Sequence, residues 1–325
     1  MHYDAGSMQG LTRNVVLGVL LGVAVYAALA VYGDVSSVAA GMAAFGWDAF
    51  GLALVLAAAN YVLRFLKWEI YRRHLGIAIP ASESFAIYLA GFSMSVTPAK
   101  LGEVLKSFLM KERYGVPVAT SAPMVLADRL TDLIALLLLL AFSTLAFGRG
   151  ALLLAAGGAI VAAIVVAVGI RGVGERIAGA LGRLPILRCR ASSIAEMFRS
   201  AHTLCRIPNL PAPTALSVAA WFAECLAFHV VVNGFPGVEV GLATSVFVYS
   251  AATVAGAIAM VPGGVGIAEG GLTGLLLLLE PTIGPGTAAA NTILVRLATL
   301  WFAVAVGLAA LAWLRFLRSY RAPMS

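Results

Sequence analysis

The chain has 325 residues, of which 61% are hydrophobic and only 11% are charged, and its mean hydropathy is +0.97. Because soluble domains carry about 25% charged residues, this composition excludes an ordinary water-soluble protein and predicts an integral membrane protein. The net charge of +7 does not indicate nucleic-acid binding, because the basic residues lie in loops beside hydrophobic runs, where they orient helices and meet anionic headgroups.

Six apolar runs are long enough to cross ~30 Å of hydrocarbon as helices. They cover residues 14–33, 48–70, 120–147, 150–170, 213–234 and 288–316. Two further apolar stretches, 84–112 and 243–279, are interrupted by Thr97-Pro98 and by Pro262-Gly263-Gly264. Proline removes a backbone donor and disfavours helix at the preceding residue, which leaves pieces too short to cross alone. We therefore expect both stretches to be re-entrant helical hairpins.

The positions of the basic residues support this topology. With the N-terminus inside, nearly all of them fall on the cytoplasmic side, including those of an Arg-rich linker over 171–212. The outer loops carry acidic residues instead, namely Asp34, Asp48, Glu239 and Glu280. If the first broken stretch crossed the membrane, the basic linker would lie outside. We therefore predict an inner-membrane protein with both termini in the cytoplasm, and either an amphipathic helix or a solvated loop within 172–204.

The two broken stretches share a motif. Each contains Pro-x-x-x-Gly followed by an acidic residue, and about thirty residues later each half has Arg-Leu-x-x-Leu. The residues are Pro98, Gly102, Glu103 and Arg129 in the first half, and Pro262, Gly266, Glu269 and Arg296 in the second. The two hairpins would enter from opposite sides, which makes the halves an inverted repeat. Inverted repeats with discontinuous helices are typical of transporters that bind substrate near the bilayer midplane.

The predicted fold class is an all-α integral membrane protein with about six spanning helices and two re-entrant hairpins in an inverted repeat. We expect residues 1–47 to form an N-terminal helix and an outer loop, and 48–147 to form the first repeat. Residues 148–212 would hold a spanning helix and the basic linker. The second repeat and a short basic tail would occupy 213–325.

The hairpin tips are the first candidate binding residues. Thr97 can cap a helix that begins at Pro98, and the free N–H groups of such a helix end bind anions such as phosphate. Lys100 adds a positive charge in the first turn. Three glycines in the second tip let the backbone approach a ligand closely, namely Gly263, Gly264 and Gly266. The alternative is that both prolines only break their helices.

The acidic residues after the tips have two interpretations each. Glu103 shares a helix face with Lys100 and Lys106, and it either neutralises these lysines or carries a proton. Glu269 has no neighbouring lysine. It either titrates in proton coupling or accepts hydrogen bonds from the free backbone of the broken helix.

Asp128, Arg129 and Asp132 open the helix of the first Arg-Leu motif. The two aspartates share a face at i,i+4 and repel each other unless a cation lies between them. They either take part in substrate binding or form a structural ion-pair cluster, for which Arg296 of the other half is a candidate partner. Charges this close to lipid should be paired.

Three more polar residues on spanning helices, Asn60, Arg64 and Glu224, are candidates for lining a cavity. For Arg64 and Lys67 we favour another prediction, in which their side chains extend to the inner interface. The three cysteines form no CxxC pair, and the chain lacks a nucleotide-binding loop, zinc-ligand spacing and a nucleophile elbow. We therefore expect no metal, no cofactor and a transporter rather than an enzyme.

Three segments resemble a known family. GFSMSVTPAKLGEVLKSFLM (91–110), LADRLTDLIALLLL (126–139) and VPGGVGIAEGGL (261–272) are similar to the lysylphosphatidylglycerol synthase transmembrane-region family, also called flippase-like domain proteins. The resemblance runs from about Asn60 to the last helix. It departs at Asp128, where the family more often has Glu, and at Lys100 and Lys106, where Arg is common. The resemblance implies a bacterial inner-membrane protein that handles lipids, here as a stand-alone member without the soluble synthase domain.

The leading hypothesis from the sequence is a lipid translocase or lipid-binding transporter. Its substrate would be an anionic phospholipid or a polyprenyl phosphate, with the headgroup between the two hairpin tips. One alternative is an intramembrane transferase that modifies a lipid or a polyprenyl-linked sugar, with Glu103 or Asp132 as base. Another is a proton-coupled small-solute transporter. Homo-oligomers and partner proteins of a lipid pathway are further expectations.

Overall fold

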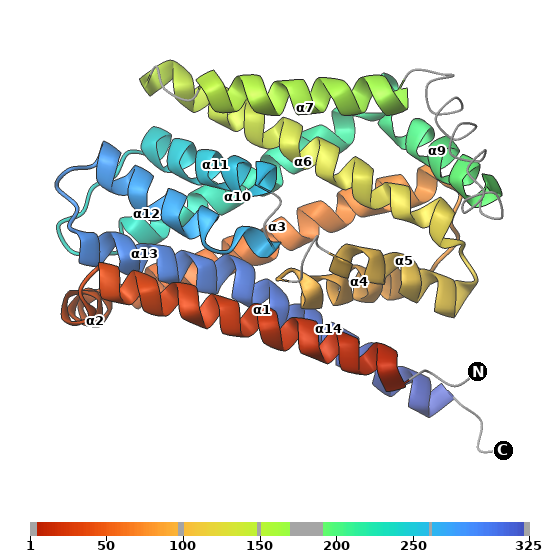
Figure 1. Ribbon diagram of the computed structural model, residues 1–325, viewed down its shortest axis with the longest axis horizontal. Coiled ribbons are helices and arrows are strands. Elements are labelled where there is room, and N and C mark those ends of the chain that lie inside the picture. Colours follow the sequence, from red (N-terminus) through yellow and green to blue (C-terminus); the bar gives the residue numbers. More distant parts are fainter. Residues whose placement is uncertain (1–4, 97–100, 148–150, 170–190, 260–261, 322–325) are drawn as a thin grey trace.

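The computed structural model describes residues 5–96, 101–147, 151–169, 191–259 and 262–321, and these residues form helices and turns without any strand (Figure 1). The first half contains α1 (Ala5–Tyr32), α2 (Val35–Ala44), α3 (Trp47–His74), α4 (Ala81–Ala90), η1 (Gly91–Met94), α5 (Leu101–Tyr114), α6 (Val118–Phe147) and α7 (Ala151–Gly169). The second contains α9 (Ala191–Cys205), η4 (Ile207–Asn209), α10 (Pro211–Val232), α11 (Leu242–Ile258), η5 (Pro262–Gly264), α12 (Ile267–Leu279), α13 (Pro285–Arg296), the π-helical turn η6 (Leu297–Trp301) and α14 (Phe302–Arg321). The predicted all-α class is confirmed for this part of the chain.

Three helices of the described residues are long and apolar enough to cross a membrane. They are Trp47–His74, Pro211–Val232 and Pro285–Phe316, and Val16–Tyr32 with Val35–Ala44 forms a fourth candidate bent by 96°. The helices α6 and α7 coincide with two further predicted runs, 120–147 and 150–170. Several apolar helices therefore support a multi-pass membrane protein.

The bend after α1 corrects one expectation. Residues 35–44 were predicted to lie in an outer loop, but they form α2. Asp34 adopts a positive φ of 61° and accepts a hydrogen bond from the Ser37 backbone N–H at 3.0 Å, which caps this helix. A side-chain acceptor at the N-cap stabilises a helix. The small residues of this segment do not by themselves predict one. Within the linker, the helical alternative is found at α9, whereas 170–190 lie outside the described residues.

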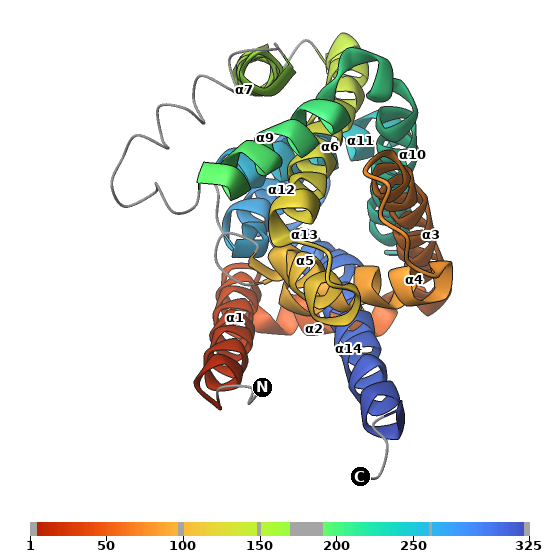
Figure 2. The ribbon, with the colours of Figure 1, turned by 90° about the vertical axis from the view of Figure 1, so that its right-hand side faces the viewer.

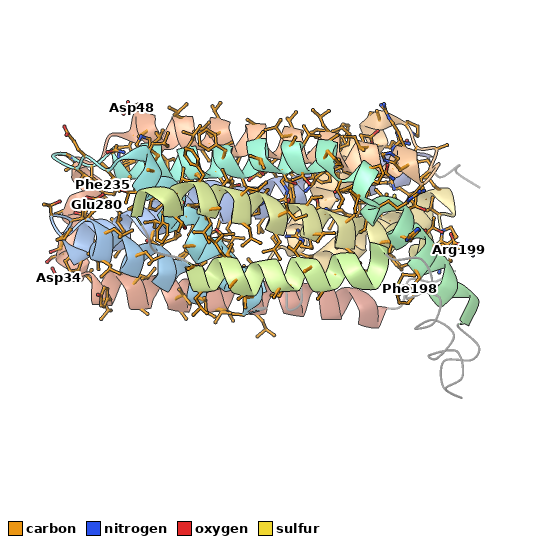
Figure 3. The ribbon with its side chains drawn as sticks, turned by 90° about the horizontal axis from the view of Figure 1, so that it is seen from above. Asp34, Asp48, Phe198, Arg199, Phe235 and Glu280 are labelled. Atoms are coloured by element: carbon orange, nitrogen blue, oxygen red, sulfur yellow. The ribbon has the colours of Figure 1, made fainter. Side chains whose placement is uncertain are left out.

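The long helices run along one axis of the molecule, and α3 packs against α10 on one flank with α1 on the other (Figures 1 and 2). Asp34, Asp48 and Glu280 lie at one end of this axis and Arg199 at the opposite end (Figure 3). The start of α1 and the end of α14 share the end near α9. Three of the predicted outer-loop acids therefore lie at the end of the molecule opposite to Arg199.

The two broken stretches lie toward opposite ends of the molecule. The helices α4 and α5 pack together toward the end where α9 lies, and α11 packs against α12 toward the other end (Figure 1). In the second stretch, α11 ends at Ile258 and α12 begins at Ile267, on either side of the predicted break Pro262-Gly263-Gly264. The predicted break of the first stretch, Thr97-Pro98, lies outside the described residues. This arrangement brings the interrupted ends of both stretches toward the middle of the molecule.

Candidate functional site

A cluster of four charged side chains joins α3 to α6. Lys67 Nζ lies 2.6 Å from Asp128 Oδ1 and 2.6 Å from Asp132 Oδ1, so a cation does lie between the two aspartates. Arg64 Nη2 lies 2.6 Å from Asp132 and 3.2 Å from Asp128. The Lys67 side chain is fully buried, so the prediction that it extends to the inner interface with Arg64 is wrong. We call these four residues the charge cluster.

A third helix, α10, contacts the charge cluster. From α10, Ser217 Oγ lies 2.8 Å from Lys67 Nζ and 3.1 Å from Asp132 Oδ1. The Trp221 ring lies 5.5 Å from the Arg64 guanidinium carbon, which is cation–π distance. Asn60 is buried and donates to the Ala220 carbonyl at 2.8 Å. Asn60 therefore ties α3 to α10.

Arg129 lies at the edge of the charge cluster. Its guanidinium is 3.6 Å from Asp128 and 3.8 Å from Asp132, beyond hydrogen-bonding distance, and 32% of its side chain is exposed. The aspartates are bound more closely by Lys67 and Arg64. Arg129 thus remains the most accessible cation around these carboxylates.

A second ion pair stabilises the second tip. Arg296 Nε donates to Glu269 Oε1 at 2.6 Å, and Arg296 Nη2 donates to the Gly263 carbonyl at 2.7 Å. The other Glu269 oxygen accepts from the Gly266 backbone N–H at 2.6 Å. Glu269 therefore makes the backbone hydrogen bond that one interpretation required. The suggestion that Arg296 pairs with the aspartates of the other half is wrong, because its carboxylate partner lies on the neighbouring α12.

The glycines of the second tip have the backbone conformation that only glycine adopts freely. Gly263, Gly264 and Gly266 have φ angles of 61°, 68° and 92°. A Cβ on Gly264 would lie 3.3 Å from the Ala268 side chain. The chain therefore reverses direction here within a few residues, between α11 and α12.

The second tip touches the end of the first broken stretch. A Cβ placed on Gly263 would lie 3.4 Å from the Ser95 carbonyl oxygen and 3.6 Å from Val96 Cα. On the other side of Val96, a Cβ on Gly18 of α1 would lie 2.8 Å from the Val96 carbonyl oxygen. Segments from both halves and from α1 therefore meet here. Thr97, Pro98 and Lys100, predicted for the first tip, lie outside the described residues, and only the helical backbone of Gly102 and Glu103 is described.

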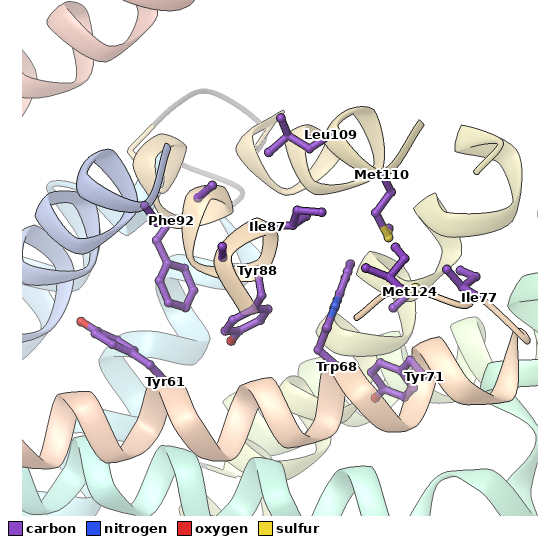
Figure 4. Close-up of a cluster of buried hydrophobic side chains, with 14 of the residues drawn as sticks. Tyr61, Trp68, Tyr71, Ile77, Ile87, Tyr88, Phe92, Leu109, Met110 and Met124 are labelled. Carbon is purple, nitrogen blue, oxygen red and sulfur yellow. The ribbon is translucent and has the colours of Figure 1, made fainter. Parts of the chain in front are cut away.

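Lys106 has an unusual environment for a buried cation. Its ammonium lies over the rings of Tyr88, Trp68 and Phe92, at 4.5, 5.1 and 5.9 Å from their centroids. Figure 4 shows these rings projecting from α3, α4 and η1 toward one another. A Cβ on Gly91 would lie 2.4 Å from Lys106 Cε, so Gly91 makes room for the lysine stem. No ion pair joins Lys106 to a carboxylate in the described part of the chain.

Glu224 is buried on α10, where Tyr249 of α11 donates a hydrogen bond to its Oε2 at 2.6 Å. Its carboxylate also interacts electrostatically with Arg64 and with Arg296. Glu224 therefore interacts with an arginine of the charge cluster and with the arginine of the second tip.

Comparison with known proteins identifies the family of the chain. Residues 15–307 match the family described as lysylphosphatidylglycerol synthase TM region. The chain belongs to this family. Two proteins of Methanothermobacter thermautotrophicus, both named UPF0104 membrane protein, are similar to it: one is 26% identical over 285 residues, covering 80% of this chain and 83% of the relative. The other is 24% identical over 293 residues, covering 80% and 82%.

Some contacts of this lysylphosphatidylglycerol synthase TM-region protein were missed in the sequence. Lys67 was predicted to reach the interface, and Ser217, Trp221 and Tyr249 were not singled out. A signal for Lys67 existed, since two aspartates at i,i+4 in apolar surroundings require a cation. Ser217 and Tyr249 give no such signal, because a single hydroxyl on an apolar helix is common.

Proposed function

We propose that this protein moves an anionic, phosphate-bearing lipid across the bilayer, with the headgroup bound where the two tips meet and the acyl chains left in the lipid. The observation that carries the proposal is the close approach of Gly263 to Ser95 and Val96, where a Cβ added to Gly263 would lie 3.4 Å from the Ser95 carbonyl oxygen. This approach brings together segments of the two broken stretches. Interrupted helices expose backbone groups inside the membrane, and these groups are tolerated where they line a polar cavity.

We further propose that α4–α5 and α11–α12 are re-entrant hairpins of an inverted repeat in a bacterial inner membrane. Their location in opposite halves of the molecule supports this interpretation. The end near Arg199 would face the cytoplasm together with both termini, and the end with Asp34, Asp48 and Glu280 would face outward.

The two tips would bind the lipid in different ways. Glu269 already accepts the Gly266 N–H at the start of α12, so this helix end has its own carboxylate. We expect the phosphate to bind before α5 rather than before α12, because Pro98 and Lys100 precede α5 in the sequence. Arg129, whose side chain is 32% exposed, would supply a second cation. The glycines of the second tip would let the backbone approach the headgroup.

The transferase alternative receives less support from the geometry. Asp132, one of the two bases that it would require, is bound by Lys67 and by Arg64 at 2.6 Å each. A carboxylate held by two cations is a weak base, because both cations favour its ionised form. A change in lipid chemistry, detected by mass spectrometry when the protein is produced, would favour the transferase.

The proposal is tested in liposomes that contain the full chain and either fluorescent phosphatidylglycerol or a fluorescent polyprenyl phosphate. We expect the protein to accelerate inversion of at least one of these lipids, and a Lys100→Ala/Arg129→Ala variant to slow it severalfold. Lys111→Ala is the control, because Lys111 is exposed near the far end of α5. The proposal fails if wild type is no faster than empty liposomes for either lipid, or if the double variant matches wild type.

A further inference from the structure

Glu224 is the buried carboxylate near the tips that lacks an ion-pair partner among the described residues. It is 7% exposed, and its hydrogen-bond partner is the Tyr249 hydroxyl. In contrast, Asp132 and Glu269 each have a cation at 2.6 Å. A carboxylate bound closely to a cation keeps its charge, whereas one that faces only a hydroxyl in apolar surroundings can exist in either state.

The charged and titratable groups around Glu224 come from each of the long helices packed against α10. They are Arg64 and Tyr61 of α3, Asp132 of α6, Tyr249 of α11 and Arg296 of α13. Both arginines have a closer carboxylate, since Arg64 binds Asp132 and Arg296 binds Glu269. Neutralising Glu224 would therefore leave both Arg64 and Arg296 paired, so this carboxyl can change its charge without isolating either cation.

The environment of Glu224 also connects it to the second tip. Arg296, which Glu224 attracts, donates to the Gly263 carbonyl at 2.7 Å. Tyr249, which binds Glu224 directly, lies on α11, the helix that leads into this tip. A change of charge on Glu224 therefore alters the forces on Arg296 and on α11 together.

We propose that Glu224 takes up and releases the proton that drives lipid movement in this protein. This inference rests on the proposed function and adds its energy source. The proton comes from water on one side, forms an O–H bond on the Glu224 carboxyl and returns to water on the other side. In the neutral state the attraction of Glu224 for Arg64 and for Arg296 disappears, which weakens the electrostatic interaction of α10 with α3 and with α13. Re-ionisation restores this attraction.

The first test compares lipid inversion with and without a pH gradient in liposomes that contain the full chain and either fluorescent phosphatidylglycerol or a fluorescent polyprenyl phosphate. A gradient of about one pH unit changes proton activity about tenfold, so wild type should respond severalfold. The ratio of the two rates should fall to near one in Glu224→Gln, which keeps a hydrogen-bond acceptor for Tyr249. Glu239→Gln, at an exposed loop carboxyl, should keep the wild-type ratio.

The outcomes separate the two proposals. If wild type moves no anionic lipid with or without a gradient, the proposed function fails. If wild type moves lipid but ignores the gradient, or if Glu224→Gln responds as wild type does, only the role of Glu224 is overturned.

A second test does not measure lipid movement, so it can also be applied to a variant that moves no lipid. Infrared difference spectra of the protein in bilayers, recorded between acidic and neutral pH, should show the carbonyl band of a protonated buried carboxyl. This band should be present in wild type and in Glu239→Gln and absent in Glu224→Gln. A wild type without the band, or a Glu224→Gln variant that retains it, would overturn the inference.

Discussion

At the scale of single residues, the charge cluster shows how this chain keeps ionised groups among apolar helices. Lys67 contacts Asp128, Asp132 and Ser217, which lie on two different helices. A buried ion pair adds little net stability over apolar residues, but removal of one partner leaves an uncompensated charge. We therefore expect the folded protein to lose much of its stability when Lys67 is replaced by an uncharged residue.

Replacing Lys67 by methionine, which has a similar length and no charge, should destabilise the protein by about 3–5 kcal/mol. The loss should appear as a lower midpoint of thermal unfolding in detergent. The matched control is Arg199→Met, because the ion pair of Arg199 with Glu196 is 71% exposed on the arginine side. An exposed pair contributes about 0.2–1 kcal/mol. Equal losses in the two variants would contradict a central role for Lys67.

At the scale of helices, the breaks matter as much as the apolar runs. The turn from α11 to α12 depends on positive φ angles at Gly263, Gly264 and Gly266. Arg296 and Glu269 then bind this turn through backbone atoms. The second tip is thus a defined structure held by side chains of α12 and α13.

Gly266→Ala isolates the backbone contribution, because a Cβ at this position would meet nothing within 4 Å. Its φ of 92° should make alanine unfavourable by about 1–2 kcal/mol. Gly270→Ala is the control, since its Cβ also meets nothing but the residue is helical, and it should stabilise by about 0.5–1 kcal/mol. Thermal unfolding of both variants checks these signs, and a stabilising Gly266→Ala would refute the conformational argument.

The sequence predicted helices and breaks better than it predicted partners. Apolar runs and the break at Pro262 indicate where helices begin and end, because these effects are local. Lys67 and Asp128 are 61 positions apart, so their contact depends on how α3 packs against α6. The similar Arg-Leu motifs suggested that Arg296 would pair across the halves, yet the capping carboxylate of Glu269 lies closer. The helix at 35–44 was missed because small residues there resemble a loop.

At the scale of the whole molecule, the two broken stretches approach each other between the ends of the bundle. A Cβ on Gly263 would lie 3.4 Å from the Ser95 carbonyl oxygen, and a Cβ on Gly18 of α1 would lie 2.8 Å from the Val96 carbonyl oxygen. Glu224 interacts with Arg64 of the charge cluster and with Arg296 of the second ion pair. Our proposal puts the headgroup site where Gly263 approaches Ser95 and Val96.

The most direct measurement of this central claim is photo-crosslinking of lipid to the full chain in bilayers that contain headgroup-labelled phosphatidylglycerol or polyprenyl phosphate. A photoreactive amino acid at Ser95 would sample the meeting point of the tips, and one at Leu278, whose side chain is exposed on α12, would sample ordinary surrounding lipid. We predict that one of these anionic lipids crosslinks at Ser95 in preference to phosphatidylcholine, and that Leu278 shows no such preference. Crosslinks at Leu278 alone, or equal capture of all lipids at Ser95, would contradict a headgroup site between the tips.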